Sequence, residues 1–136
     1  MSEYVSARLM ELVATRAENR CEYCHIHAED AFFGCEVDHI ISTKHGGSTS
    51  ESNLAYSCAI CNRNKGSDLG SIFWQTGELI RFFNPRMDSW DDHFDLEGPR
   101  IATLTNIGEV TARILGFNSE ERMLERRELI ALERYP

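Results

Sequence analysis

The sequence predicts an α+β protein whose central strand and short helix are held together by a bound metal. Two Cys-x-x-Cys pairs, at residues 21–24 and 58–61, favour the metal site. An apolar segment typical of a strand lies between them, and helical spacing of apolar residues occurs at both ends of the chain. A chain of 136 residues is expected to form a single domain, with a core motif at about residues 20–66 and an accessory part at about residues 70–136.

Composition indicates a globular protein outside the membrane. Hydrophobic residues make up 42% of the chain, which is too many for a disordered segment. No apolar run reaches the length of a membrane span, and the first residues, Met1 to Tyr4, do not resemble a signal peptide. We therefore expect a cytoplasmic protein. A reducing compartment favours metal binding over disulfides for its five cysteines.

The net charge of −8 argues against binding of nucleic acid by bulk electrostatics. There are 22 acidic and 14 basic residues. This balance does not exclude a nuclease that has a small basic patch and a bound divalent cation.

The first segment, from about Ser2 to Asn19, is predicted to be an amphipathic packing helix. Its apolar residues recur at helical spacing on one face, namely Val5, Leu9, Leu12 and Val13.

The four cysteines of the two pairs, Cys21, Cys24, Cys58 and Cys61, are predicted to bind one structural zinc. The pairs are 33 residues apart, so the intervening chain must fold back as a hairpin. Four thiolates complete a tetrahedral zinc site and leave no open position for catalysis. Cys35 is expected to be a small buried residue. His25 and His27 could compete as zinc ligands, although a solvated turn is the simpler interpretation of this segment.

A strand is predicted from Cys35 to Ile41, with Asp38 and His39 among its apolar residues. A buried charge without a partner costs several kcal/mol, so this pair is expected at a strand end beside a metal or a cleft. Neighbours in a regular strand face opposite ways, so the strand must end or bend there if both serve one site. A short helix is then predicted from Cys61 to Lys65, closed by Gly66.

Together these motifs resemble the HNH endonuclease family, the ββα-metal nucleases. The resemblance covers about residues 20–66 and depends on motifs in the family's order, namely Cys21-x-x-Cys24, Val37-Asp38-His39-Ile40, Gly46-Gly47, Asn53-Leu54 and Cys58-x-x-Cys61-Asn62-x-x-Lys65. It implies that His39 activates water and that Asn53 holds the loop that orients His39. The third position of the motif is Asn62 rather than His, which is an H-N-N variant that the family accepts.

The resemblance implies metal-assisted phosphodiester hydrolysis, with DNA as the expected partner. A histidine of pKa about 6.5 can be neutral at pH 7 and take a proton from water. Asp38 and Asn62 would hold a divalent metal, expected to be Mg²⁺ or Mn²⁺, because carboxylate and amide oxygens suit a hard cation. Substrate contacts are expected from the nearby basic residues, with Lys65 first and then Arg63, Lys44 and His45.

The accessory part is predicted to contain a hairpin and helices. Residues 75–78 form a turn between Ile72–Trp74 and Leu79–Phe83, and Ile101–Leu104 is a further candidate strand. Helices are predicted from about Ile107 to Leu115 and after a cap at Asn118 or Ser119. Arginines alternate with glutamates in the last helix, which is typical of an exposed helix, namely Arg122, Arg126 and Arg127. Arg81 and Arg86 are further candidates for phosphate contact.

A second interpretation comes from another functional class. The chain would then be a non-catalytic zinc-knuckle module that binds nucleic acid or protein. The absent third histidine and the acidic composition favour it, whereas the ordered presence of Asp38, His39, Asn53 and Asn62 favours the nuclease.

Overall fold

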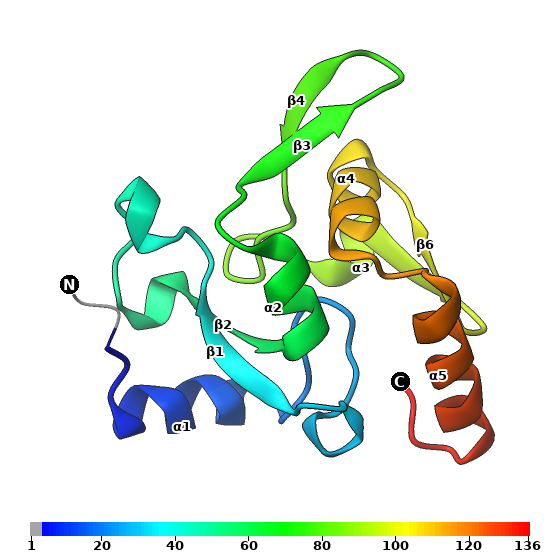
Figure 1. Ribbon diagram of the computed structural model, residues 1–136, viewed down its shortest axis with the longest axis horizontal. Helices are drawn as coiled ribbons and strands as arrows, with labels where there is room; N and C mark the ends of the chain where they lie inside the picture. The colour runs from blue at the N-terminus through cyan, green and yellow to red at the C-terminus, as the bar shows by residue number, and fades with distance from the viewer. Residues whose placement is uncertain (1–3) are drawn as a thin grey trace. The chain divides into compact units, whose positions relative to one another are not determined.

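A computed structural model describes residues 4–136, in which the chain forms two compact units (Figure 1). The first unit ends at Ser67 and the second begins at Asp68, close to the predicted start of the accessory part. The predicted helix start at Ser2 lies outside the described residues. No helix among the described residues has both the length and the apolar character needed to cross a membrane.

The first unit opens with helix α1, Ala7–Arg16. Ser6 caps its start, since its side chain accepts a hydrogen bond from the backbone N–H of Leu9 at 3.2 Å. The helix ends before Glu18 and Asn19, both of which have positive φ angles and therefore leave the helical conformation. The predicted helix is thus present but shorter at both ends, since it begins only at Ala7.

A strand–strand–helix arrangement follows α1. Strand β1, Cys35–His39, pairs antiparallel with β2, Leu54–Cys58, and helix α2, Ala59–Lys65, continues directly from β2. The first unit also contains short 3-10 helices at Ala28–Asp30, Thr43–His45 and Glu51–Asn53. This ββα order confirms the predicted α+β fold.

The two faces of the β1–β2 hairpin have different roles. One face packs against α1, where Val37 and Tyr56 are cross-strand partners beside the buried Val5, Val13 and Leu54. Side chains alternate along a strand, so Glu36 and Asp38 both lie on the other face. That face lies next to α2. Cys58 ends β2 and also caps α2, since its Sγ accepts a hydrogen bond from the backbone N–H of Cys61 at 3.4 Å.

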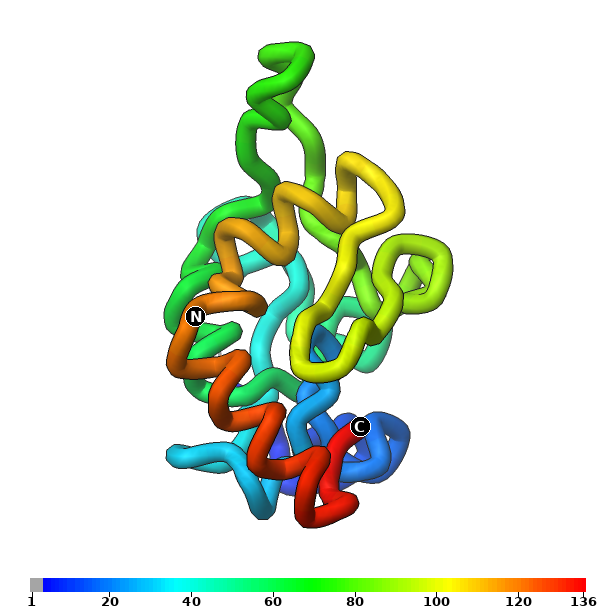
Figure 2. The backbone as a smooth tube through the Cα atoms, turned by 90° about the vertical axis from the view of Figure 1, so that its right-hand side faces the viewer, coloured from blue at the N-terminus to red at the C-terminus, as the bar shows by residue number. Residues whose placement is uncertain are grey.

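The second unit contains two antiparallel hairpins and three helices. The hairpins are β3–β4 and β5–β6, and the first confirms the predicted turn near residues 75–78. Their bounds are Gly70–Phe73 for β3, Glu78–Arg81 for β4, Phe94–Glu97 for β5 and Arg100–Thr103 for β6. The helices are α3, Trp90–His93, α4, Asn106–Leu115, and α5, Glu120–Ala131. After α5 the chain turns back beside the helix (Figure 2).

The prediction that Arg122 and Arg126 lie on an exposed helix face is wrong. Both are buried, with exposed fractions of 7% and 2%. Arg126 donates to the backbone carbonyls of Pro99 at 2.6 Å and Phe117 at 2.5 Å, and Arg122 donates to that of Leu115 at 3.2 Å. Their guanidinium groups therefore bind α5 to the segments around it, a role that charge alternation along one helix does not reveal.

Candidate functional site

Four buried cysteines meet at one point of the first unit. The Sγ atoms of Cys21, Cys24, Cys58 and Cys61 all lie within 4.8 Å of one another. The first two come from the turn after α1, and the others come from the end of β2 and the first turn of α2. The hairpin therefore brings the two distant pairs together, as their spacing predicted.

The geometry of this cluster fits a tetrahedral zinc. Zn–S bonds of roughly 2.3 Å in a tetrahedron place the sulfurs about 3.8 Å apart. The Sγ atoms of Cys24 and Cys58 lie 3.7 Å apart. Burial raises the pKa of the Cys21 and Cys61 thiols, so thiolates at these two positions need a bound cation.

Other candidate ligands lie outside the cluster. His27 approaches Glu29, with 3.7 Å between Nδ1 and Oε1, and neither His25 nor His27 joins the group of potential ligands found among residues 4–136. Cys35 is half-buried beside its strand partner Cys58, and burial raises its pKa to about 12. A neutral thiol is the favoured form of Cys35.

Asp38 lies on the α2 face of β1, where it forms an ion pair with Lys65. The Nζ atom of Lys65 lies 3.2 Å from Oδ2 of Asp38 and 3.1 Å from the backbone oxygen of His39. Burial raises the pKa of Asp38, and the charge of Lys65 opposes this increase. Lys65 thereby links the last turn of α2 to the end of β1.

His39 is the last residue of β1 and contacts the following loop. Its Nε2 atom lies 2.8 Å from Oγ1 of Thr49. His39 is half-buried. Strand β1 ends here, two residues before the predicted end at Ile41.

Asn53 explains this early end of the strand. Its Oδ1 accepts from the backbone N–H of Ile41 at 2.9 Å, and its Nδ2 donates to the carbonyls of Ile41 at 2.9 Å and Ser48 at 2.8 Å. A side chain therefore occupies the backbone groups that would otherwise extend the ladder. These bonds fix the loop that carries Thr49.

Gly47 makes this loop geometry possible. A Cβ at this position would lie 1.7 Å from the carbonyl oxygen of Ile41 and 2.8 Å from Nδ2 of Asn53. Its neighbour Gly46 has open space around it, but its φ of +88° is a backbone conformation that favours glycine.

Asn62 lies on α2, half-buried, and its amide nitrogen donates to the carboxylate of Glu36. Glu36 and Asp38 are two residues apart on β1, so they share the face that lies next to α2. Asn62 and Lys65 therefore each contact an acidic residue of β1.

The basic residues differ in exposure. Lys44, His45 and Arg63 are exposed, as a substrate contact requires. Lys65, which was expected to be the first substrate contact, is only 2% exposed and is therefore much less accessible than the other three. Its helix face packs against β1, and its charge is directed at Asp38.

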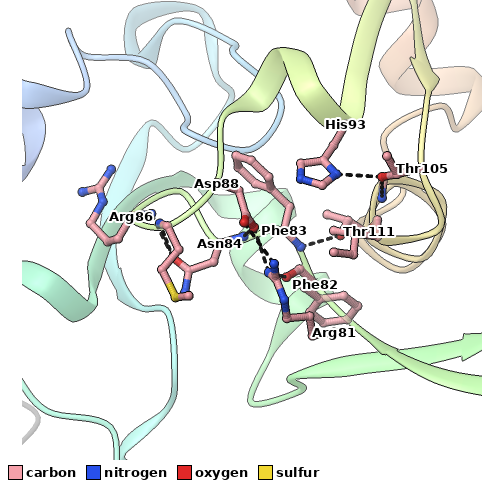
Figure 3. Close-up of polar contacts among 12 residues, drawn as sticks. Arg81, Phe82, Phe83, Asn84, Arg86, Asp88, His93, Thr105 and Thr111 are labelled. Atoms are coloured by element: carbon pink, nitrogen blue, oxygen red, sulfur yellow. Dashed lines mark hydrogen bonds and ion pairs between the residues drawn. The ribbon is translucent and has the colours of Figure 1, made fainter.

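In the second unit, Arg81 is held by an acidic partner (Figure 3). Its two terminal nitrogens donate to the two carboxylate oxygens of Asp88 at 2.8 and 3.0 Å. Arg86 extends away from this pair, and the backbone of the turn is fixed by the side chain of Asn84. His93 contacts Thr105, with 2.7 Å between Nδ1 and Oγ1.

Comparison with known proteins identifies the segment that carries the cysteine cluster and the β1–β2–α2 unit. Residues 21–68 match the HNH endonuclease family. None of the curated proteins and none of the solved structures compared with the chain matched it. The HNH match confirms the resemblance drawn from the sequence and indicates a nuclease-type function that involves nucleic acid.

Two residues near the HNH motif were not predicted as site residues. Thr49 is one of several hydroxyl residues in a polar loop, and nothing in the sequence distinguishes it from Ser48 or Ser50. Glu36 could have been noticed from its i, i+2 spacing to Asp38, which puts both carboxylates on one strand face.

Proposed function

We propose that the protein is a metal-dependent HNH endonuclease that hydrolyses phosphodiester bonds in DNA, with His39 as the general base. The observation that carries this proposal is the position of His39. It ends β1 beside Asp38, its ring is held by Thr49, and the segment around it matches the HNH family.

Thr49 is the proposed partner that sets the proton on the His39 ring. If Nε2–H donates to the hydroxyl oxygen of Thr49, then Nδ1 is unprotonated and can accept a proton from water. The bonds of Asn53 to Ile41 and Ser48 hold the loop at the distance this contact needs. A general base positioned in this way contributes about 10²–10⁴-fold to a rate.

Asp38 and Asn62 are the residues proposed to hold the catalytic metal, Mg²⁺ or Mn²⁺. A carboxylate and an amide oxygen are the donor types that such cations prefer. When bound, the cation supplies stabilisation of negative charge on the scissile phosphate and the leaving oxygen. The zinc proposed for the four thiolates has a different task, because it fixes the start of α2 and hence the position of Asn62.

DNA binding is proposed to depend on a small basic patch rather than on the whole surface. The exposed Lys44, His45 and Arg63 are the candidate phosphate contacts. With a net charge of −8, long-range attraction of DNA is weak, so binding should depend on these few contacts. Loss of a single cation should weaken binding strongly, whereas the dependence of binding on salt should be shallow.

The alternative function is a non-catalytic zinc-knuckle module that binds nucleic acid or protein. The ion pair of Asp38 with Lys65 favours it, because an ammonium group there already compensates the charge of the carboxylate. The third histidine of the motif is also replaced by Asn62.

A plasmid assay separates the two functions. Zinc-loaded wild type is incubated with supercoiled plasmid and Mg²⁺ or Mn²⁺, beside His39→Ala and the matched histidine variant His93→Gln of the second unit. We expect wild type and His93→Gln to nick or cut, and His39→Ala to lose about 10²–10⁴-fold in rate.

The remaining outcomes are also informative. Equal cutting by wild type and His39→Ala would remove His39 from the mechanism. Absence of cutting by a folded, zinc-loaded wild type, together with retained DNA binding in a gel-shift assay, would favour the binding module.

A further inference from the structure

The amide of Asn62 poses a problem that a carboxylate at the same position would not. An asparagine amide presents an oxygen on one side and an NH₂ group on the other, and the two are almost identical in shape. Only the oxygen can bind a cation, whereas the NH₂ group repels it. An asparagine in a metal site therefore needs a partner that selects one of the two orientations.

Glu36 is placed to make this selection. Its carboxylate receives a hydrogen bond from Nδ2 of Asn62. An ionised carboxylate accepts hydrogen bonds and donates none, so it can pair with the NH₂ side of the amide and not with the oxygen. Flipping the amide would set two acceptors against each other. The oxygen of Asn62 is thereby turned away from Glu36.

The backbone supports this assignment. Glu36 and Asp38 alternate with Val37 along β1 and so point to the same side, toward the helix that carries Asn62. Lys65, three residues after Asn62, bonds to Asp38 from the same helix. No described residue donates a hydrogen bond to Oδ1 of Asn62, which leaves that oxygen available.

We propose that Glu36 is a positioning residue, which holds the Asn62 amide with its oxygen directed to the divalent metal. This inference rests on the proposed metal site at Asp38 and Asn62. Glu36 itself does not bind the metal. The residue that would orient Asn62 thus lies on β1, two residues before Asp38.

Binding of Mn²⁺ to the zinc-loaded protein, measured by titration calorimetry and by the loss of the free-ion EPR signal, tests the proposal without any cleavage reaction. Loss of a partner that orients a metal ligand costs about 10–100-fold in affinity. We expect this loss in Glu36→Ala. Glu36→Gln can pair with either side of the Asn62 amide, because its own amide both accepts and donates, so it should lose part of the affinity, but less than Glu36→Ala. Glu11→Ala, which removes an exposed carboxylate from α1, is the matched charge control and should bind normally.

The decisive comparison uses Asn62→Asp as a second background. The two oxygens of a carboxylate are equivalent, so Asp at this position needs no orienting partner. Glu36→Ala should then cost less than about twofold, in contrast to its effect beside Asn62. An equal loss in both backgrounds would overturn the proposal, because it would make Glu36 a direct ligand or a general source of charge.

Two further results of the Mn²⁺ titrations would count against the positioning role of Glu36. Unchanged Mn²⁺ affinity in Glu36→Ala, or no binding of Mn²⁺ by zinc-loaded wild type, would overturn the proposal. Thermal unfolding of each zinc-loaded variant checks that a loss of affinity does not reflect a loss of fold. If the expected pattern of Mn²⁺ affinities appears but wild type does not cut DNA, the positioning role stands and the nuclease assignment fails.

Discussion

The two units of the chain are stabilised in different ways. Besides its four cysteines, the first unit buries a few scattered apolar residues and one aromatic ring, namely Val5, Val13, Tyr23, Ile26, Ile40, Leu54 and Ala55. The second unit has a larger apolar interior with several aromatic rings, and its buried members include Phe82, Phe83, Phe94, Ile101, Val110, Leu115 and Phe117. A metal at the four cysteines would add to the first unit stability that aromatic packing supplies in the second.

The buried cations show the same contrast. Lys65 of the first unit pairs with a carboxylate, whereas Arg126 of the second unit donates to the backbone carbonyls of Pro99 and Phe117. The stabilisation from an ion pair is lost when either charged side chain is removed. Hydrogen bonds to backbone carbonyls need only the arginine side chain.

Removal of zinc should have the largest effect and should act on the first unit alone. Zinc contributes about 10–16 kcal/mol to folding in zinc-finger peptides, more than a small unit's own stability. We expect Cys58→Ser or a chelator to unfold the first unit, seen as collapse of its amide resonances in NMR spectra. Fluorescence of Trp74 and Trp90, both in the second unit, should change little.

Cys35→Ser is the control for this experiment, because Cys35 lies outside the cluster. It should keep one zinc per chain by elemental analysis. Native resonances of Val13 and Leu54 in the zinc-free protein would contradict the view that metal holds the first unit together.

Truncation of Phe94 should have the next largest effect and should act on the second unit. Its ring lies 5.5 Å from those of Phe83 and Phe117 and 5.0 Å from that of Trp90, measured between centroids. Phe94→Ala should lower the free energy of unfolding by about 3–5 kcal/mol, because it removes a buried ring and leaves a cavity. Urea unfolding followed by tryptophan fluorescence measures this loss.

Zinc content should be unchanged in Phe94→Ala, which distinguishes the two modes of stabilisation. Leu104→Ala is the matched control, since Leu104 is 57% exposed, and should change stability by less than about 0.5 kcal/mol. A loss of zinc from Phe94→Ala would show that the two units are not independent.

Removal of Lys65 should destabilise the first unit by an intermediate amount. Breaking a fully buried pair costs roughly 3–5 kcal/mol, because the remaining charge has no partner. Asp38 keeps 16% of its side chain exposed, so we expect about 2–3 kcal/mol for Lys65→Met. The double variant Asp38→Asn/Lys65→Met should recover part of this loss in chemical unfolding, and no recovery would mean that Lys65 acts through packing alone.

Replacement of Asp88 should have the smallest effect and should depend on pH. Hydrogen bonds from Arg81 hold the pKa of Asp88 below its ordinary value, so its stabilising effect is present above that value and is lost as the pH falls. Arg81 is half-exposed, which limits the cost of Asp88→Asn to about 1 kcal/mol at neutral pH. The difference from wild type should shrink below about pH 4, and a constant difference would argue against the ion pair.

Local sequence signals predicted most of the elements. The spacing of Leu9, Leu12 and Val13 identified α1, although Val5 precedes the helix. The cysteine pairs identified the cluster and the hairpin between them. Each of these signals is periodic or has a fixed spacing, so it can be recognised without knowing what lies nearby in space.

Burial of the charged residues could not be predicted in the same way. Lys65 and Arg126 have sequence neighbours that are typical of exposed helices, and their partners come from β1 and from the segments near Pro99 and Phe117. The contact of His39 with Thr49 depends on how a polar loop is folded by Asn53. Such partners are determined by the tertiary structure, and no periodic sequence pattern indicates them.

The adjacent glycines of the His39 loop have a consequence for how this sequence can vary. Gly46 needs only a residue that tolerates a left-handed backbone, and asparagine meets that requirement with open space around it. Gly47 has no substitute, because any side chain would collide with the carbonyl of Ile41 and with the amide of Asn53. Substitution of Gly46 should therefore strain the loop by an amount that depends on the new residue. Any substitution of Gly47 should disrupt the loop and with it the position of His39.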